Sequence, residues 1–332
     1  MALDSAVFDR FELITVPRSR GVPSFAQDVA RGLRSEPKRL PSKYFYDDVG
    51  SALFDAITHL PEYYLTRAEA EILSDWGWQI VRLLEAPVDF LELGSGNAAK
   101  TRLLIGEALR VQTGLTYTPI DISTEALRAS SLALVETYPN LRVRAYAGDY
   151  FDVLESHYAP SDRKMLAMFM GSNIGNYEPD EALALLRLLS GALRPGDGLL
   201  LGADLKKDRA TLELAYDDPT GVTAAFDRNM LARINRELRG DFDVRNFTHV
   251  ARYDEARGSV DSFLEARERA VVTIRAADLR VEINAGERIQ TESSYKFSDG
   301  EIVELGRAVG LRPGSAWYDR ARRFSLHLLV RE

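Results

Sequence analysis

Segments that resemble buried strands alternate with helical segments between residues 87 and 205, and this alternation restricts the fold more than any other feature. In the strand segments apolar residues form short runs, whereas in the helical segments they recur at helical spacing. Strand and helical segments alternate over about 120 residues, which is the pattern of a doubly wound α/β sheet. Strands are expected at 87–93, 116–122, 141–149 and 164–170, a turn and a strand at 194–205, and helices at 101–109, 123–138 and 179–193.

The residues before this region follow another pattern. We expect mostly irregular structure over the first 40 residues, with one helix at 25–34, because this stretch is mixed, charged and interrupted by prolines. Helical spacing returns at 51–57 and 66–84. Thr66 is the expected N-cap of the second of these helices, with Glu69 at the capping-box position.

The residues after Leu205 predict a separate α+β unit. Residues 207–238 have helical spacing, and several short alternating strands are expected between 246 and 297. The tail from 301 to 332 predicts a helix, a strand, a turn and a strand. An antiparallel pair of that kind would complete the sheet of the α/β region.

Composition limits the classes of function. A chain of 332 residues is long enough for two hydrophobic cores. The net charge of -8 disfavours a nucleic-acid partner, and the absence of cysteine excludes disulfides and thiolate chemistry. The N-terminus lacks the order of a signal peptide, and no apolar run approaches the roughly 20 residues that span a bilayer. We therefore expect a cytoplasmic monomer with no membrane or nucleic-acid partner.

The stretch LELGSGNAAKTRLL is the clearest ligand-binding signal. Gly94 and Gly96 allow a sharp turn between a strand and a helix, whose N-terminus offers free N–H groups. Ala99 stands where a dinucleotide fingerprint needs its third glycine, so the stretch is neither that motif nor a P-loop. An acidic residue before GSG is typical of S-adenosylmethionine sites. A strand-to-helix turn without a ligand is the simplest alternative.

Acidic residues follow the next two expected strands. Asp121 ends PIDIST about 25 residues after the glycines, where a carboxylate can accept hydrogen bonds from both ribose hydroxyls. Helix capping is the alternative for this acid, although Ser123 or Thr124 could cap instead. Asp149 in AGDY could bind the adenine amine, with Tyr150 beside the ring. Because ligands bind at the carboxyl ends of such strands, these groups together favour a cofactor site.

Polar residues also follow the fourth strand. Asn173 and Asn176 of GSNIGNYEP would lie at the mouth of the sheet, near a methyl acceptor, although ordinary turn chemistry is an equal alternative. The four histidines show no metal-ligand spacing, so no metal site is predicted and none of them is given a catalytic role. His327 lies in a strand-like run and is expected to be a packed core residue.

The segment KYFYDDVGSALFDAITHLPEYYLTRAEAEIL, residues 43–73, closely resembles the signature of L-histidine Nα-methyltransferases, which make hercynine for ergothioneine biosynthesis. The resemblance extends through ELGSGNAAKTR, GSNIGN, AYDDPTGVTAAFDRN and TESSYKF and covers nearly the whole chain. It implies a Rossmann-like class I methyltransferase domain, 70–208 and 297–332. It also implies an α+β substrate-binding domain built from two separated segments, 1–69 and 209–296.

The same resemblance implies roles for individual residues. Those that would contact S-adenosylmethionine, which leaves as S-adenosylhomocysteine, are Gly94, Lys100, Asp121, Asp149 and Tyr150. Tyr63, Asn176 and Tyr216 would hold the amino and carboxylate groups of the amino-acid substrate, with Tyr46 and Tyr63 at the reacting amine. Glu292 and Ser294 would bind the imidazole. Without the motif match, the default reading of the three tyrosines is half-buried core aromatics.

One position departs from the family pattern. Ser262 in VDSFLEAR stands where histidine-specific members often carry methionine, and it would lie opposite Glu292. A small polar residue there would enlarge or wet the side-chain pocket. Three hypotheses follow: trimethylation of histidine to hercynine, Nα-methylation of tryptophan or another aromatic amino acid, and a non-enzymatic regulator that binds the cofactor or an amino acid. Glu292 and Ser294 favour histidine.

Overall fold

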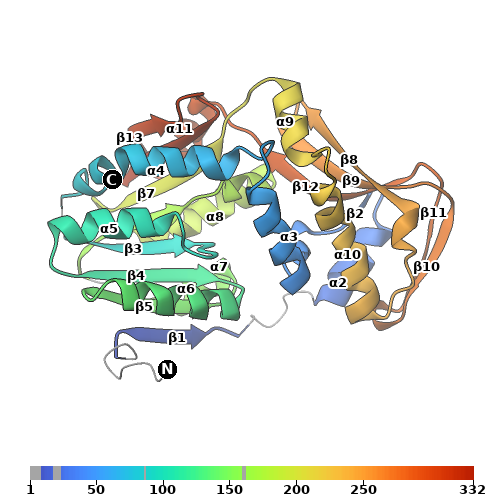
Figure 1. Cartoon of the computed structure of the whole chain (residues 1–332), viewed down its shortest axis with the longest axis horizontal. Coiled ribbons are helices and arrows are strands. Elements are labelled where there is room, and N and C mark those ends of the chain that lie inside the picture. Colours follow the sequence, from blue (N-terminus) through green and yellow to red (C-terminus); the bar gives the residue numbers. More distant parts are fainter. Residues whose placement is uncertain (1–8, 18–23, 86, 159–161) are drawn as a thin grey trace. The chain divides into compact units, whose positions relative to one another are not determined.

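A computed structural model describes residues 9–17, 24–85, 87–158 and 162–332, which divide into two compact units (Figure 1). The first unit contains the described part of residues 1–20 with residues 67–205 and 297–332. The second contains the described part of residues 21–66 with residues 206–296. Each unit is therefore assembled from segments that lie far apart in the sequence.

The first unit is built on an eight-stranded sheet in the order β1-β5-β4-β3-β6-β7-β14-β13. In this order, neighbouring strands pair in parallel as far as β7. The last two strands differ, because β14 is antiparallel to β7 and to β13. The order reverses between β3 and β6, and ligands bind such sheets at this switch point. The strands are β1 (Phe11–Thr15), β3 (Val88–Leu93), β4 (Leu115–Asp121), β5 (Leu141–Ala147), β6 (Lys164–Phe169), β7 (Gly198–Asp204), β13 (Leu311–Tyr318) and β14 (Phe324–Arg331).

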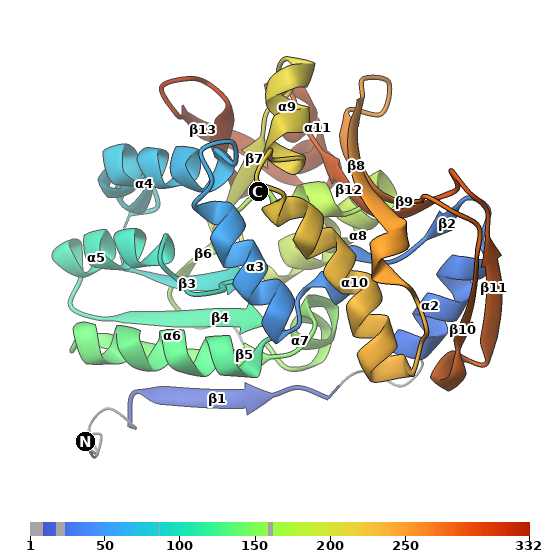
Figure 2. The ribbon, with the colours of Figure 1, turned by 45° about the vertical axis from the view of Figure 1, so that its right-hand side comes forward.

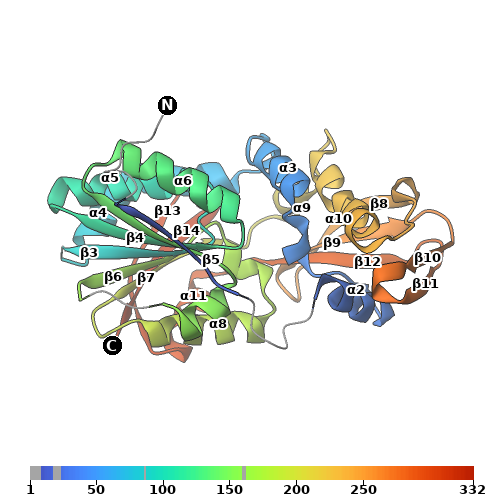
Figure 3. The same cartoon turned by 90° about the horizontal axis from the view of Figure 1, so that it is seen from below.

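Helices cover both faces of this sheet (Figure 3). Every residue of β3 and β7 is buried, as expected for central parallel strands packed on both sides. In the part of the chain that the structure describes, no helix is long and apolar enough to cross a membrane. The helices on one face are α4 (Leu65–Arg82), α5 (Thr101–Val111) and α6 (Thr124–Thr137), and those on the other are α8 (Pro179–Ala192) and α11 (Asp299–Ala308).

The strands expected within 87–205 and the helix, strand, turn and strand of the tail are confirmed. Two elements of this unit were not predicted. Residues 11–15 form β1 rather than irregular structure, because their backbone pairs with the edge of β5. Residues 9–17 thus join the first unit, whereas we assigned all of 1–69 to the second domain; residues 1–8 and 18–23 lie outside the described residues. The other unpredicted element is α7 (Tyr150–Ser156), which Asp149 caps.

The second unit is a four-stranded sheet in the order β2-β12-β9-β8, with a β10–β11 hairpin and helices (Figure 2). The expected helix at 25–34 is confirmed as α2. The helical segment expected at 207–238 forms two helices, and Asp218 stabilises the turn between them by accepting hydrogen bonds from Val222 N and Thr223 N. Its elements are α2 (Phe25–Arg34), β2 (Lys38–Arg39), α3 (Asp48–Thr58), α9 (Arg209–Tyr216), α10 (Val222–Leu238), β8 (Phe247–Asp254), β9 (Ser259–Ala266), β10 (Ala270–Ile274), β11 (Leu279–Ile283) and β12 (Arg288–Tyr295).

Candidate active site

The turn after β3 lies at the switch point of the sheet. Gly94 and Gly96 have φ angles of 72° and 51°, in the left-handed region that favours glycine. A Cβ atom on Gly94 would lie 2.6 Å from Tyr150 Oη and 2.9 Å from Asn173 Nδ2, whereas one on Gly96 would meet nothing within 4 Å. The turn after β3, the start of α7 and the loop after β6 therefore meet at Gly94.

The two acids at the ends of β4 and β5 have different local roles. Asp121 accepts hydrogen bonds from Gly96 N and from Ser123 N, both at 3.0 Å, while the Ser123 side chain caps α6. Asp149 is exposed and caps α7 by accepting a hydrogen bond from Phe151 N at 2.9 Å. Each carboxylate keeps lone pairs that a ligand could use, since a carboxylate has about four acceptor sites.

Lys100 binds Glu69, for which we wrongly predicted a role in a capping box. Thr66 lies inside α4, which begins at Leu65, so Glu69 does not complete a capping box there. Glu69 is fully buried instead and forms an ion pair with Lys100 Nζ. Its other carboxylate oxygen accepts a hydrogen bond from Gly171 N at 2.8 Å. Glu69 thus links α4 to the residue that precedes α5 and to the loop after β6.

That loop also contains the predicted substrate residue of the first unit. Residues 173–176 form a short 3-10 helix, and Asn176 at its end is exposed. The other residues predicted to bind the substrate belong to the second unit.

In the second unit, three of the predicted residues are tyrosines that lie in or beside a group of aromatic rings. Tyr46 is 37% exposed, and its ring meets Phe54 edge-on with centroids 5.5 Å apart. Tyr63 is buried and packs edge-on against both Phe54, at 6.1 Å, and Tyr216, at 6.4 Å. The predicted tyrosines are thus brought together by direct packing and through Phe54.

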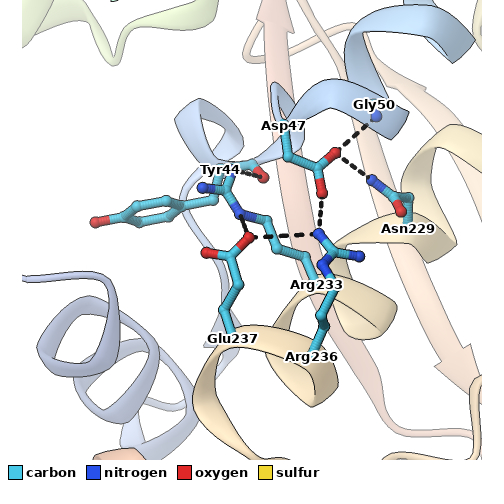
Figure 4. A network of polar contacts seen from close by, with 7 residues as sticks. All are labelled: Tyr44, Asp47, Gly50, Asn229, Arg233, Arg236 and Glu237. Atoms are coloured by element: carbon cyan, nitrogen blue, oxygen red, sulfur yellow. Dashed lines mark hydrogen bonds and ion pairs between the residues drawn. The ribbon is translucent and has the colours of Figure 1, made fainter.

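A polar network fixes the segment that carries Tyr46 (Figure 4). Asp47 caps α3, accepts a hydrogen bond from Asn229 Nδ2 at 2.9 Å and forms an ion pair with an arginine of α10. Arg233 of the same helix donates to the Tyr44 carbonyl at 2.8 Å. Hydrogen bonds and an ion pair therefore connect residues before and after Tyr46 to α10.

Tyr216, Ser294 and Lys296 form a buried triangle of polar atoms. Tyr216 Oη and Ser294 Oγ lie 2.8 Å apart, and Lys296 Nζ donates to each of them at 2.8 Å. Lys296 is only 2% exposed, and its Nζ lies 4.5 Å from the centroid of the Tyr216 ring. The triangle joins the end of α9 to the end of β12.

Glu292 lies two residues before Ser294 on β12. Its cross-strand partner is Ser262, as predicted, and paired residues of an antiparallel sheet share a face. Ser294 is on the same face, because side chains alternate along a strand. Part of the Glu292 side chain remains accessible, but no hydrogen bond to its carboxylate is present among the described residues. Burial raises the pKa of Glu292 to about 7, although the charge of Lys296 opposes this shift.

His249 is a residue that the sequence analysis missed. Its Nδ1 lies 2.6 Å from Asp227 Oδ2, and its Nε2 lies 2.8 Å from the carbonyl oxygen of Tyr216. Because a carbonyl only accepts, Nε2 carries a proton. Burial disfavours the imidazolium, but the hydrogen bond and charge of Asp227 raise the pKa of His249. The alternation of buried residues along FTHVARYD was the available signal, since it turns His249 inward.

His327, by contrast, is the buried strand residue that we expected. It is 4% exposed on β14, and burial lowers its pKa despite the nearby Asp299.

The raised pKa of Glu292 predicts a pH dependence of stability. Between the ordinary value of 4.5 and about 7 the native carboxyl holds more proton than the unfolded one, so stability falls as pH rises. Glu292→Gln removes this ionisation. From pH 5 to pH 7.5 the unfolding free energy of the wild type should fall relative to this variant by about 1–3 kcal/mol. Urea unfolding at both pH values measures it. Glu282→Gln, at an exposed position, is the matched control. The unfolding free energy of the wild type should change little relative to this control between the two pH values, and an equal change relative to both variants would contradict the prediction.

The strand order, the glycine turn at the switch point and the acids that follow β4 and β5 define a class I S-adenosylmethionine-dependent methyltransferase. Within that class, the chain belongs to the family of histidine-specific, SAM-dependent methyltransferases, which matches residues 25–331. It is 45% identical over 306 residues to histidine N-alpha-methyltransferase of Mycobacterium tuberculosis (strain CDC 1551 / Oshkosh), covering 92% of this chain and 94% of that protein.

Two further relatives are similar over most of this chain. Histidine N-alpha-methyltransferase of Mycolicibacterium smegmatis (strain ATCC 700084 / mc(2)155) is 43% identical over 307 residues, covering 92% of this chain and 94% of the relative. Ergothioneine biosynthesis protein 1 of Neurospora crassa is 31% identical over 303 residues, which are 89% of this chain and 33% of that protein. The recognition of the family from its sequence motifs is confirmed.

Proposed function

We propose that this chain transfers methyl groups from S-adenosylmethionine to the α-amine of L-histidine and adds three of them, which gives hercynine. The observation that carries the proposal is Glu292, a carboxylate with no hydrogen-bond partner among the described residues, on the sheet face of Ser294. The Glu292 side chain is only partly accessible and its carboxylate has no partner from the described residues, so it is available to a ligand that donates a hydrogen bond.

Histidine has the chemistry that this strand face requires. A neutral imidazole has one N–H donor and one acceptor nitrogen. Glu292 would accept from the N–H, and Ser294 would bind the other nitrogen. Amino acids whose side chains lack these groups would leave Glu292 unpaired and would bind much more weakly.

The tyrosines and Asn176 would hold the reacting end of the substrate. Tyr63, Tyr216 and Asn176 would bind its amino and carboxylate groups, with Tyr46 beside the amine. Methyl transfer needs an unprotonated amine that points its lone pair at the methyl carbon, so positioning by these residues supplies much of the rate. A water would receive the ammonium proton, either directly or through the Tyr46 hydroxyl, which would pass its own proton to solvent as it takes up the one from the amine. Aromatic rings also stabilise the growing quaternary ammonium.

The first unit would hold the cofactor, which supplies an electrophilic methyl group on a sulfonium sulfur. Its residues fit this group: the side of Gly96 that would carry a Cβ atom is open for at least 4 Å, and Asp149 is exposed with spare acceptor sites. Asp121 would bind the ribose hydroxyls, Asp149 the adenine amine and Tyr150 the ring. Gly94 and Lys100 would line the amino-acid portion.

Alanine substitutions at the two glycines are expected to differ. At both positions a Cβ atom adds strain of about 1 kcal/mol, because φ is positive. Only Gly94→Ala also pushes against Tyr150 and Asn173. We expect it to weaken S-adenosylhomocysteine binding by about 10–100-fold, and Gly96→Ala to weaken it less. Calorimetric titration measures both affinities; equal losses would contradict the assigned role of the Gly94 contacts.

Tryptophan or another aromatic amino acid is the second candidate substrate, and Ser262 favours it. Ser262 is buried directly opposite Glu292, and its side chain is small. It would leave room for a larger ring than methionine does. With no partner among the described residues, Glu292 argues against phenylalanine, which has no side-chain donor. The acceptor nitrogen that Ser294 would bind separates histidine from tryptophan, whose indole only donates.

A reaction with mixed amino acids, read by mass spectrometry, tests the proposal. L-Histidine should gain three methyl groups, whereas tryptophan, tyrosine and phenylalanine should gain none at equal concentration. Methylation of an aromatic amino acid but not of histidine would establish the second candidate. No methylated amino acid at all would favour a regulator that only binds. The proposal includes a monomeric state in the cytoplasm, for which light scattering and fractionation are the tests.

A further inference from the structure

Tyr216 contacts the sheet of the second unit through both of its ends. It is the last residue of α9, and the last carbonyls of a helix have no partner within the helix. The Tyr216 carbonyl oxygen lies 2.8 Å from His249 Nε2 on β8. At the other end, the Tyr216 hydroxyl lies 2.8 Å from Ser294 Oγ on β12. The contact with His249 therefore helps to determine where the hydroxyl lies over the sheet.

His249 lies on the sheet face that carries the proposed imidazole site. The strand β8 pairs with β9 so that Ala251 is opposite Ser262, and Ser262 is in turn opposite Glu292. Because side chains alternate along a strand, His249 shares the face of Ala251 and therefore that of Glu292. His249 is only 6% exposed, and both α9 and α10 pack on its strand. It is thus a buried part of the same face.

Asp227 on α10 keeps His249 in the form that donates to the Tyr216 carbonyl. A carbonyl only accepts, so Nε2 carries a proton. His249 Nδ1 lies 2.6 Å from Asp227 Oδ2, and a second proton must lie between them, because two lone pairs would repel at that distance. The pair is therefore neutral as a whole, whichever atom holds this proton. Asp227 is 2% exposed, and its other oxygen has no hydrogen-bond partner among the described residues, so its carboxylate depends on His249.

We propose that His249, oriented by Asp227, is a positioning residue that places the Tyr216 hydroxyl over the substrate face of the sheet. This inference rests on the proposed function, in which Tyr216 helps to hold the amino and carboxylate groups of the substrate. His249 needs no contact of its own with the substrate, because it acts through the backbone of Tyr216. Misplacement of a positioned group by about 1 Å can cost about 100-fold in rate, so a fixed carbonyl has a large effect.

Two variants that differ in the donor to the Tyr216 carbonyl test the inference. In Asp227→Asn an amide N–H donates to His249 Nδ1, so the proton on Nε2 stays while neither side chain is charged. The neutral background matters because Asp227 raises the pKa of Glu292 and His249 lowers it. Adding His249→Phe then removes the donor but keeps a ring. Asp227→Asn should bind L-histidine within about threefold of the wild type, and the double variant at least about 10-fold more weakly.

A cycle with the Tyr216 hydroxyl separates positioning from general damage. All titrations use the full chain with S-adenosylhomocysteine present. The same two proteins are compared again after Tyr216→Phe has removed the hydroxyl. If His249 acts through that hydroxyl, its loss should now weaken histidine binding by less than about threefold. An equal factor with and without the hydroxyl would overturn the inference, because His249 would then be merely structural.

The remaining outcomes are also decisive. His59→Phe, at an exposed histidine that contacts the Asp55 carbonyl of its own helix, is the matched control and should bind histidine as the wild type does. If the double variant does not fold, Asp227→Leu with His249→Leu replaces the buried pair by apolar residues, and the same cycle decides. Unchanged histidine binding after the loss of His249 would overturn the inference and leave histidine methylation intact. No histidine binding by the wild type would instead overturn the proposed function.

Discussion

Glu292→Ala is expected to weaken binding of L-histidine by about 100-fold. The carboxylate has no hydrogen-bond partner among the described residues, so a ligand N–H would be its only direct one there. Removing it leaves that N–H unpaired in a site where burial already raises the pKa of the carboxyl to about 7. An aromatic amino acid without a ring N–H should lose little.

Calorimetric titration of histidine and phenylalanine, with S-adenosylhomocysteine present, measures this difference. Glu292→Gln keeps the shape and one acceptor oxygen, so it should lose less than the alanine variant. Glu282→Ala removes an exposed carboxylate of the β10–β11 hairpin and serves as the matched control. Histidine binding that survives Glu292→Ala unchanged would remove the main support for imidazole recognition by this residue.

Much of the fold could be predicted from the spacing of apolar residues along the sequence. Central strands such as β3 and β7 are rich in apolar residues because both of their faces are covered, and such segments are easy to recognise. The strand β1 was missed because it has only five residues and is stabilised by pairing with β5, which no local pattern reveals. The break between α9 and α10 was not predicted because it depends on hydrogen bonds that one side chain, Asp218, accepts from the backbone.

The predicted site residues differ in how well the sequence could describe them. Motifs named Tyr216, Ser294 and Glu292, and strand pairing then explains why Ser262 lies opposite Glu292. The groups that support them could not be predicted in the same way. The contact between His249 and the Tyr216 carbonyl joins residues 33 positions apart, and it exists only once α9 is packed on the sheet. Residues that act through others carry little local signal.

Glu69→Ala is expected to lower the free energy of unfolding by about 3 kcal/mol. The fully buried carboxylate of Glu69 compensates the Lys100 ammonium and accepts a hydrogen bond from Gly171 N. The substitution leaves the Lys100 ammonium without its counter-charge and the Gly171 N–H without its acceptor. The loop after β6 and the start of α5 should then move independently, so S-adenosylhomocysteine binding should weaken as well. Urea unfolding and calorimetric titration of the same preparation measure the two effects.

A double substitution shows whether Glu69 acts through Lys100. Lys100→Met alone leaves a buried carboxylate without its cation, which is also costly. If the ion pair is the main link, Glu69→Ala combined with Lys100→Met should cost less than the sum of the single changes, by about 1–3 kcal/mol. Strict additivity would mean that the Gly171 hydrogen bond, rather than the ion pair, makes Glu69 important. Glu69→Gln separates these contributions further, because it can keep that hydrogen bond while it removes the charge.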